Sequence, residues 1–184
     1  MEKGSAMSAQ LLPPAVVTRI PIHAAVPGNV QLASIRTAEP KDVIEIAALI
    51  NHYAALGQML PRKEESVYQN IHEFIVTESQ SKVIACGALH HWDNESAEVR
   101  SLAVAEEYAG QGLGKQIVNR LLGLGIERGF GYAFALTLQV RFFEKLGFAI
   151  VKKSVLPQKI WGDCIICPFL YNCHETAMVK ELKK

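Results

Sequence analysis

The chain has 184 residues, of which 49% are hydrophobic, and its 19 basic residues nearly balance its 18 acidic ones. This length fits one domain with a core of its own, and the near-zero net charge shows no sign of the excess basic charge typical of proteins that bind nucleic acids or membranes. No apolar run approaches the roughly 20 residues that a membrane span needs, and the first residues lack the pattern of a secretory signal.

Residues 1–31 carry few charges, scattered prolines and no sustained hydrophobic period. We expect them to form a flexible N-terminal extension, followed by a single domain over residues 32–184. The alternating apolar residues over 30–38 predict a first strand. A helix is expected to begin at Pro40, because the apolar positions that follow recur at intervals of three and four.

The next part of the chain reads as a short helix and three strands. Residues 60–74 are expected to form a loop that leads into the helix, with one apolar side. Two strands over 74–78 and 82–92 flank the turn residues SQS and predict a hairpin. The polar stretch DNES then precedes another strand over 97–105.

The segment EYAGQGLGKQ, residues 107–116, carries three glycines at alternate positions and then a lysine. It is not a Walker loop, because Gly114-Lys115 is followed by Gln116 and Ala109 stands where that loop needs its first glycine. The dinucleotide fingerprint G-x-G-x-x-G fails in both registers. The spacing therefore excludes the two commonest nucleotide-binding loops.

The same segment still favours phosphate binding. Gly110, Gly112 and Gly114 remove the side chains that would keep a phosphate from the backbone N–H groups. A helix beginning near Leu113 would add unpaired N–H donors and a favourable dipole, and Lys115 would add a positive charge. The alternative is an ordinary glycine-rich turn before an amphipathic helix.

Four elements are expected in the C-terminal part. The apolar run 132–138 predicts a strand buried on both faces, and 140–148 predicts a short helix capped by Gly147. Two strands, over 148–156 and 176–182, follow it. Antiparallel strands, then a strand–loop–helix–strand unit, predict an α/β fold with a mixed, mostly antiparallel sheet and helices on both faces.

The stretches VRSLAVAEEYAGQGLGKQIVNRLL, FALTL and RFFEKLGF together resemble the acetyl-CoA core of the GNAT superfamily of N-acetyltransferases. The loop pattern of that family, [QR]-x-x-G-x-[GA], aligns with residues 109–114, with Ala109 in place of Arg or Gln. The resemblance implies the GNAT fold and a loop that holds the pyrophosphate of coenzyme A. The implied coenzyme-binding residues are Leu102, Ala103, Val104, Gly110, Gln111, Gly112, Leu113, Gly114, Lys115 and Phe143.

Over residues 32–182 the stretches LPRKEE, IACGALHHW, AEVRSLAV, FFEKLGF and LPQKIWGDCIICP resemble the single-domain bacterial N-acetylglutamate synthases. This implies direct acetyl transfer from acetyl-CoA to the α-amino group of L-glutamate, the first step of arginine biosynthesis. One alternative is a GNAT enzyme for another small amine or amino acid, such as glutamine. Another is a non-catalytic acyl-CoA sensor or interaction module. A homodimer is left open, and no nucleic-acid or membrane partner is expected.

Glu98 is the candidate general base, because the strand 97–105 would run beside the thioester and a carboxylate there can accept the proton of the amine. The resemblance supports this role, and the alternative is a solvent-facing charge paired with Arg100. Thr137 matches a hydroxyl-bearing position of the synthases and would donate to the departing thiolate or orient a water. An ordinary strand residue is the alternative for Thr137. Many GNAT enzymes carry a tyrosine in the segment where this chain has Phe142 and Phe143, so that phenol is missing.

L-Glutamate carries two carboxylates, so a site that binds it needs positively charged side chains in fixed positions. Arg62 matches the substrate-binding arginine of the synthases, and a guanidinium can hold a carboxylate with two parallel hydrogen bonds. Arg100 and Lys159 are further candidates. The alternatives are a solvated loop residue for Arg62, a structural partner of Glu98 for Arg100, and a plain surface position for Lys159.

Cys164, Cys167 and Cys173 form a C-x2-C-x5-C pattern. C-x2-C is a frequent half of a structural zinc site, but the second half is missing, and Asp163 or a residue from elsewhere would have to supply the fourth ligand. Three interpretations stay open: a structural zinc clip, a redox-sensitive pair and plain thiols. The chain has four cysteines in all, which favours a reducing, cytoplasmic setting over a disulfide framework.

Overall fold

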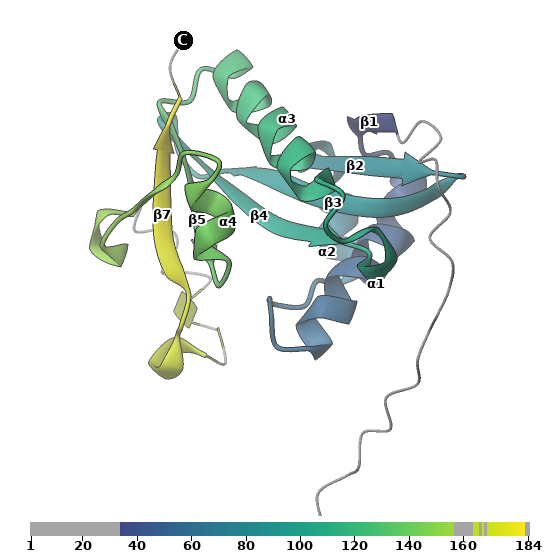
Figure 1. The fold of residues 1–184 in the computed structure, drawn as a ribbon, viewed down its shortest axis with the longest axis horizontal. Helices are drawn as coiled ribbons and strands as arrows, with labels where there is room; N and C mark the ends of the chain where they lie inside the picture. The colour runs from purple at the N-terminus through teal and green to yellow at the C-terminus, as the bar shows by residue number, and fades with distance from the viewer. Residues whose placement is uncertain (1–33, 157–163, 166, 168, 183–184) are drawn as a thin grey trace, which may run out of the picture.

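A single sheet of seven strands organises the described part of the chain, in the order β1-β2-β3-β4-β5-β7-β6 (Figure 1). The computed structural model describes residues 34–156, 164–165, 167 and 169–182. Neighbouring strands are antiparallel except β4 and β5, which are parallel, so the predicted mixed sheet is confirmed. The strands are β1 (Ser34–Thr37), β2 (Phe74–Ser79), β3 (Lys82–His91), β4 (Ser96–Val104), β5 (Tyr132–Thr137), β6 (Ala149–Ile150) and β7 (Thr176–Glu181).

Helices cover both faces of the sheet. The α-helices are α1 (Val43–Ala55), α2 (Glu64–Gln69), α3 (Leu113–Glu127) and α4 (Val140–Glu144). Single 3-10 turns lie at Pro40–Asp42, Ile71–Glu73, Glu106–Tyr108, Lys153–Val155 and Leu170–Asn172. Residues of α1 and α2 share one core cluster, while residues of α3 and α4 share another on the opposite face (Figure 1). The predicted arrangement of helices on both faces is confirmed.

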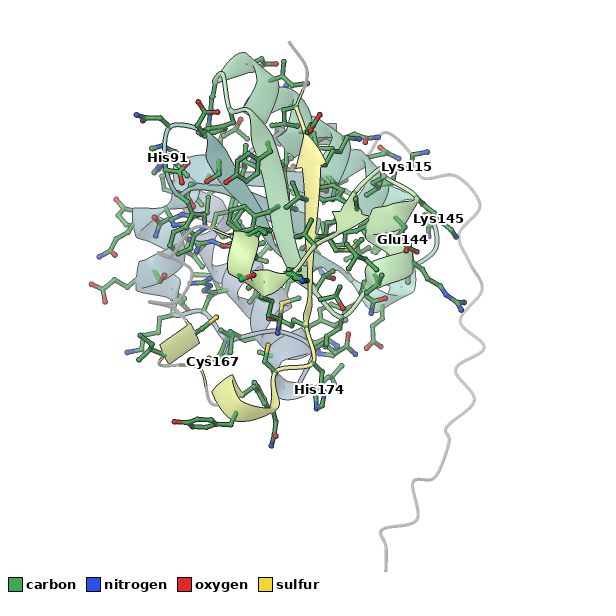
Figure 2. The ribbon with its side chains drawn as sticks, turned by 90° about the vertical axis from the view of Figure 1, so that its left-hand side faces the viewer. His91, Lys115, Glu144, Lys145, Cys167 and His174 are labelled. Carbon is green, nitrogen blue, oxygen red and sulfur yellow. The ribbon has the colours of Figure 1, made fainter. Side chains whose placement is uncertain are left out.

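The last part of the chain departs from the expected strand over 148–156. The strand β6 has only two residues, both exposed, and Lys153–Val155 form a 3-10 turn instead. An edge strand pairs on one side only, so exposed side chains leave little burial to hold it extended. The turn returns Leu156 to the core. Further along, Cys167 and His174 lie near the start of β7 (Figure 2). Lys159, Asp163 and the expected extension over 1–31 lie outside the described residues.

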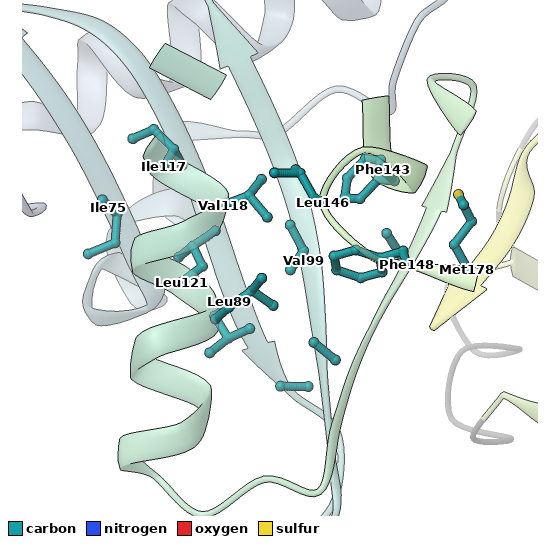
Figure 3. Close-up of a cluster of buried hydrophobic side chains, with 14 of the residues drawn as sticks. Ile75, Leu89, Val99, Ile117, Val118, Leu121, Phe143, Leu146, Phe148 and Met178 are labelled. Atoms are coloured by element: carbon teal, nitrogen blue, oxygen red, sulfur yellow. The ribbon is translucent and has the colours of Figure 1, made fainter. Parts of the chain in front are cut away.

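The helix α3 packs as its sequence period predicts. Leu113, Ile117 and Leu121 recur every four residues, and all three are buried in one core cluster. Figure 3 shows Ile117 and Leu121 directed toward the strands. On the sheet, side chains alternate between the two faces: Leu89 contacts the α3 side, and Ala88 belongs to the α1 side. This packing fixes the start of α3, and hence the glycine segment before it, relative to β4.

Gly87 in β3 leaves no room for a side chain. A Cβ built there would lie 2.7 Å from Cγ2 of Ile117 and 3.3 Å from Cδ1 of both Leu102 and Leu121. We expect Gly87→Ala to lower the free energy of unfolding by about 1–3 kcal/mol, because the core must shift to admit a methyl group. Urea unfolding of the two proteins measures this difference.

Gly123→Ala in α3 is the matched control. Apart from the helix's own backbone, the nearest atom to a Cβ at Gly123 is Nη1 of Arg120, at 3.9 Å, so the methyl group makes only an ordinary van der Waals contact. Alanine in a helix interior should instead stabilise the protein by about 0.5–1 kcal/mol. Equal stability of Gly87→Ala and the unsubstituted protein would contradict the tight packing of α3 on β3.

Candidate active site

The strands β4 and β5 form a fork at the centre of the sheet. They pair in parallel from Ser96 opposite Tyr132 to Glu98 opposite Phe134, and beyond this point they diverge (Figure 1). A cavity of about 610 Å³ lies in the opening. Its walls come from the separated parts of β4 and β5, the segment before α3, the loop between α1 and α2, α4 and the cysteine-bearing segment. Elements far apart in the sequence therefore meet around one space.

A β-bulge lies in the wall that β4 contributes. Cys86 pairs with Ala103 and Ala88 pairs with Arg100, so Gly87 alone faces the two residues Ser101 and Leu102. Ser101 has a φ of 54°, a backbone conformation that residues other than glycine rarely adopt. A bulge bends its strand and leaves one residue outside the ladder. Sequence reasoning missed it, although a glycine inside a strand pattern was a signal for it.

The glycine segment turns through two positive φ angles, which glycine adopts readily. Gly110 has a φ of 76° and Gly112, at the start of α3, has a φ of 81°. A side chain there would be strained even though open space surrounds both positions. Gly114 differs, because a Cβ there would come 3.5 Å from the ring of Phe142.

Most of the residues proposed for coenzyme binding share the cavity wall. These are Leu102, Ala103, Val104, Gly110, Leu113, Gly114 and Phe143. Among the described residues, the wall does not include Gln111, Gly112 or Lys115, which are exposed beside it. Exposure at a loop that opens to solvent is compatible with binding a charged group such as a pyrophosphate.

Glu98 occupies the point of the fork. Its residue is 9% exposed, and its Oε2 accepts a hydrogen bond from Nε1 of Trp92 at 2.9 Å. Nη1 of Arg100 lies 3.9 Å from the same oxygen. The alternative of a solvent-facing strand charge is wrong, because the carboxylate is buried at the edge of the cavity.

Arg100 lies between two carboxylates. Its Nη2 is 3.5 Å from Oε2 of Glu73, and its Nη1 approaches Glu98. Glu73 is buried and also accepts a hydrogen bond from Nδ1 of His90 at 2.8 Å. These contacts support the interpretation of Arg100 as a structural partner of Glu98, although it also lines the cavity. Glu73 and His90 thus join Arg100 and Glu98 in one charged network, which the sequence analysis did not predict.

Arg62 reaches the cavity from the loop between α1 and α2. Its backbone is fixed by Asn51, whose Nδ2 donates to the Arg62 carbonyl and whose Oδ1 accepts from the Arg62 N–H, both at 2.9 Å. Within the described parts of the chain, the Arg62 guanidinium forms no ion pair with an acidic side chain. A half-buried cation on a fixed backbone is suited to binding an anionic ligand.

Thr137 and Phe143 lie where β5 ends and α4 follows. Thr137 is buried, and its Oγ1 accepts a hydrogen bond from the backbone N–H of Gln139 at 2.9 Å. Its own O–H proton is not used in this hydrogen bond. Phe143 packs against the ring of Phe148, with ring centroids 5.1 Å apart. The side chain at Phe143 can close the cavity but cannot supply a proton.

Tyr53 is a cavity residue that the sequence did not indicate. It lies on α1, and its hydroxyl donates a hydrogen bond to the carbonyl of Val104. Burial raises the pKa of Tyr53, and the charges of Glu106 and Glu107 add to this effect. One lone pair of the carbonyl of Val104, which the resemblance implies as a coenzyme-binding residue, is therefore already occupied.

The three cysteines of the C-x2-C-x5-C pattern also line the cavity, as free thiols. Burial raises the pKa of the Cys164 thiol, and the nearby Cys173 and Cys167 raise it further. In the residues that the structure describes, no group of three or more His, Cys, Asp or Glu side chains could hold a metal ion. The zinc interpretation of Cys164, Cys167 and Cys173 therefore has no support.

Two further charged residues lie beside these cysteines and were not predicted. Lys153 and Glu175 are both partly buried in the cavity wall. Burial raises the pKa of the Glu175 carboxyl, while the charge of Lys153 lowers it. This end of the cavity thus combines thiols, an amine and a carboxyl group.

The described helices are all too short or too polar to cross a membrane.

The acetyltransferase (GNAT) family matches residues 41–148, which include β4, the glycine segment, α3, β5 and α4. The chain is 38% identical over 148 residues to an uncharacterized N-acetyltransferase of Chlorobaculum tepidum, which covers 80% of this chain and 96% of that protein. It is 32% identical over 133 residues to an amino-acid acetyltransferase of Mycobacterium tuberculosis, which covers 70% of this chain and 75% of that protein.

The fold is similar to that of a solved N-acetylglutamate synthase from Neisseria gonorrhoeae in complex with coenzyme A and N-acetyl-glutamate. The TM-score is 0.76 at 25% sequence identity, over 85% of this chain. The match covers 36% of the Neisseria chain, so this chain spans about a third of that protein.

Proposed function

Because the chain belongs to the acetyltransferase (GNAT) family, we propose that it transfers the acetyl group of acetyl-CoA directly to the α-amino group of L-glutamate. The products would be N-acetyl-L-glutamate and CoA. The observation that carries the proposal is the buried Glu98 at the point of the β4–β5 fork, facing a cavity that the glycine segment also lines. A protein that only sensed acyl-CoA would need no buried carboxylate there.

Binding of acetyl-CoA would use backbone groups more than side chains. The positive φ values of Gly110 and Gly112 turn the segment before α3, and the first N–H groups of that helix have no partner within it. Such a helix start attracts anions, and the pyrophosphate of the coenzyme is one. The exposed Lys115 in the first turn adds positive charge from the solvent side.

Transfer requires that the amine loses a proton before it attacks the thioester carbonyl. Glu98 would accept this proton, directly or through a water, and Trp92 holds its carboxylate in place through the hydrogen bond to Oε2. The oxyanion that develops would be stabilised by a backbone N–H near Ala103, and the bulge at Ser101 and Leu102 offers a further donor.

The thiolate of CoA is the leaving group, and a thiol of this kind has a pKa of roughly 8–9 by analogy with cysteine. Its departure therefore needs only modest help. Thr137 would donate its hydroxyl proton toward the thiolate or orient a water, since its oxygen already accepts from Gln139. This assignment compensates for the missing phenol at Phe143.

The two acceptor carboxylates would be bound by Arg62, together with Arg100 and Lys159. Arg62 is the strongest of the three, because its guanidinium faces the cavity without an acidic partner in the described residues. The similarity of the chain to an amino-acid acetyltransferase and to an N-acetylglutamate synthase supports an amino-acid acceptor.

Glutamine is the second candidate acceptor. Arg100 is shared between Glu73 and Glu98, and the wall also contains the Glu175 carboxyl. Both features weaken the positive potential that a second carboxylate would meet, whereas a side-chain amide carries no charge. Both candidates share the α-carboxylate that Arg62 would bind.

The deciding experiment measures free thiol released from acetyl-CoA with each of a panel of L-amino acids. Thiol release that requires L-glutamate supports the proposal. Thiol release with L-glutamine alone would make glutamine the acceptor. Release with other amines only would overturn both acceptors but keep the acetyltransferase. Bound acetyl-CoA with no release in any mixture would favour the non-catalytic sensor.

Arg62→Ala should raise the KM for the amino-acid acceptor about 10- to 100-fold while changing the KM for acetyl-CoA little, because a charge-assisted hydrogen bond contributes about 1.5–3 kcal/mol. Steady-state kinetics with each substrate varied in turn measure both constants. Lys63→Ala, at the exposed neighbouring position, is the matched control and should leave both constants unchanged. If Lys63→Ala raised the KM as much as Arg62→Ala, the effect would come from the loss of any positive surface charge and not from a specific contact of Arg62.

A further inference from the structure

Lys153 and Cys173 form a close pair in the cavity wall that the proposed transfer reaction does not use. Nζ of Lys153 lies 3.1 Å from Sγ of Cys173 and 3.5 Å from its carbonyl oxygen. Lys153 belongs to the 3-10 turn after β6, and Cys173 lies three residues before β7. An amine and a thiol are thus held in contact by two separate segments.

The pair lies at the cavity end of the fork. Thr176, the first residue of β7, pairs with Thr137, the last residue of β5. Cys173 precedes the start of β7 by three residues, and both it and Lys153 line the cavity whose wall includes Glu98. A reactive acyl group bound between β4 and β5 therefore lies in the same space as the thiol and the amine.

We propose that Lys153 and Cys173 form a self-acetylation site, in which an acetyl group passes from acetyl-CoA to Sγ of Cys173 and then to Nζ of Lys153. This inference rests on the proposed function, which supplies acetyl-CoA to the cavity. Thiols exchange readily with thioesters, and an amine in contact with a thioester captures its acyl group irreversibly as an amide.

Both steps balance without an external oxidant or reductant. In the first, the Cys173 thiolate attacks the acetyl carbonyl carbon, a new C–S bond forms, and the C–S bond to CoA breaks. The departing CoA thiolate takes a proton from the Lys153 ammonium and leaves as a thiol, so that Lys153 becomes a neutral amine. In the second, this amine attacks the Cys173 thioester, an amide forms on Nζ, the C–S bond to Cys173 breaks, and the proton lost from Nζ passes to the Cys173 sulfur.

Two of the other cysteines, Cys86 and Cys167, lack this arrangement. Cys86 is fully buried in β3, where burial raises the pKa of its thiol to about 12. Sγ of Cys167 accepts a hydrogen bond from the backbone N–H of Phe169 at 3.4 Å. In the described part of the chain, Cys173 is the cysteine whose sulfur contacts a lysine amine. Sγ of Cys173 also lies 4.0 Å from Oε2 of Glu175, so the thiol, the amine and the carboxyl group form one cluster.

Acetylation of Lys153 would change the chemistry of the cavity wall. It replaces an ammonium group by a neutral amide, and so removes the positive charge that acts on the nearby Glu175. The acceptor end of the cavity would become more negative, which disfavours an anionic acceptor. The modified enzyme would be expected to bind an amino acid with a second carboxylate less tightly than the unmodified enzyme.

The test incubates the full chain with acetyl-CoA and no acceptor, and quantifies acetylation of each lysine by peptide mass spectrometry. Lys153 should be acetylated about tenfold more than the adjacent Lys152, an exposed control on the same segment, because only Lys153 lies beside the thiol. In Cys173→Ser the excess at Lys153 should disappear, whereas Cys167→Ser should retain it.

Lys153→Arg provides the second variant. It keeps the positive charge but cannot form the amide, so the acetyl group should remain on Cys173 as a thioester that neutral hydroxylamine removes. Equal acetylation of Lys153 and Lys152 in a protein that releases thiol with an acceptor would overturn this inference alone. A chain that neither binds nor turns over acetyl-CoA would overturn the proposed function and this inference with it.

Discussion

Glu98→Gln is expected to lower the rate of acetyl transfer about 100-fold, because the amide cannot accept the proton of the attacking amine. The substitution preserves the local geometry, since an amide oxygen can still accept the hydrogen bond that Nε1 of Trp92 donates to Oε2. Binding of acetyl-CoA should therefore be unchanged. Initial rates of thiol release at saturating substrates, together with calorimetric titration of acetyl-CoA, separate the two effects.

Glu181→Gln is the matched control for this prediction. Glu181 is exposed at the end of β7, and its amide should leave the transfer rate unchanged. If Glu98→Gln retained the full rate with intact binding of both substrates, Glu98 would be a structural partner of Arg100 and Trp92, and another group would have to serve as the base. A loss in Glu98→Gln that was restored at high pH would instead support the base, because a larger share of the acceptor amine is then deprotonated.

Phe134→Ala is expected to lower the free energy of unfolding by about 4 kcal/mol. Phe134 is 0% exposed and belongs to a cluster with Leu156 and Ala177, so the truncation leaves a cavity in the core. It also pairs with Glu98 on the last rung that β4 and β5 share. We therefore expect the variant to lose activity under conditions where it is still folded. Urea unfolding and thiol release on the same samples measure both quantities.

Tyr171→Ala provides the comparison, because Tyr171 is also aromatic but 95% exposed. Its loss should change the free energy of unfolding by no more than about 0.5 kcal/mol. Phe134→Leu, which keeps most of the volume, should fall between the two. A Phe134→Ala protein as stable as Tyr171→Ala would contradict the packing of β5 against the turn that returns Leu156 to the core.

Much of the candidate site could be predicted from local sequence. The glycine segment between an alternating strand and an amphipathic helix indicated the β4–α3–β5 unit, because positive φ values and helical periods are properties of neighbouring residues. Glu98 could be named as a candidate for a similar reason, since its strand leads directly into that segment. The same local reasoning failed at β6, where the expected strand over 148–156 is longer than a one-sided edge can hold.

The sequence by itself determined the class of fold, the glycine-rich turn before α3 and the residue types available for catalysis, because these depend on patterns within a few turns of chain. Only the tertiary structure decided which side chains share the cavity. The bulge opposite Gly87, the placement of Arg100 between Glu73 and Glu98, and the contact of Lys153 with Cys173 all join residues from separate elements. Such contacts arise from strand register and from the packing of helices on the sheet, and no local period encodes them.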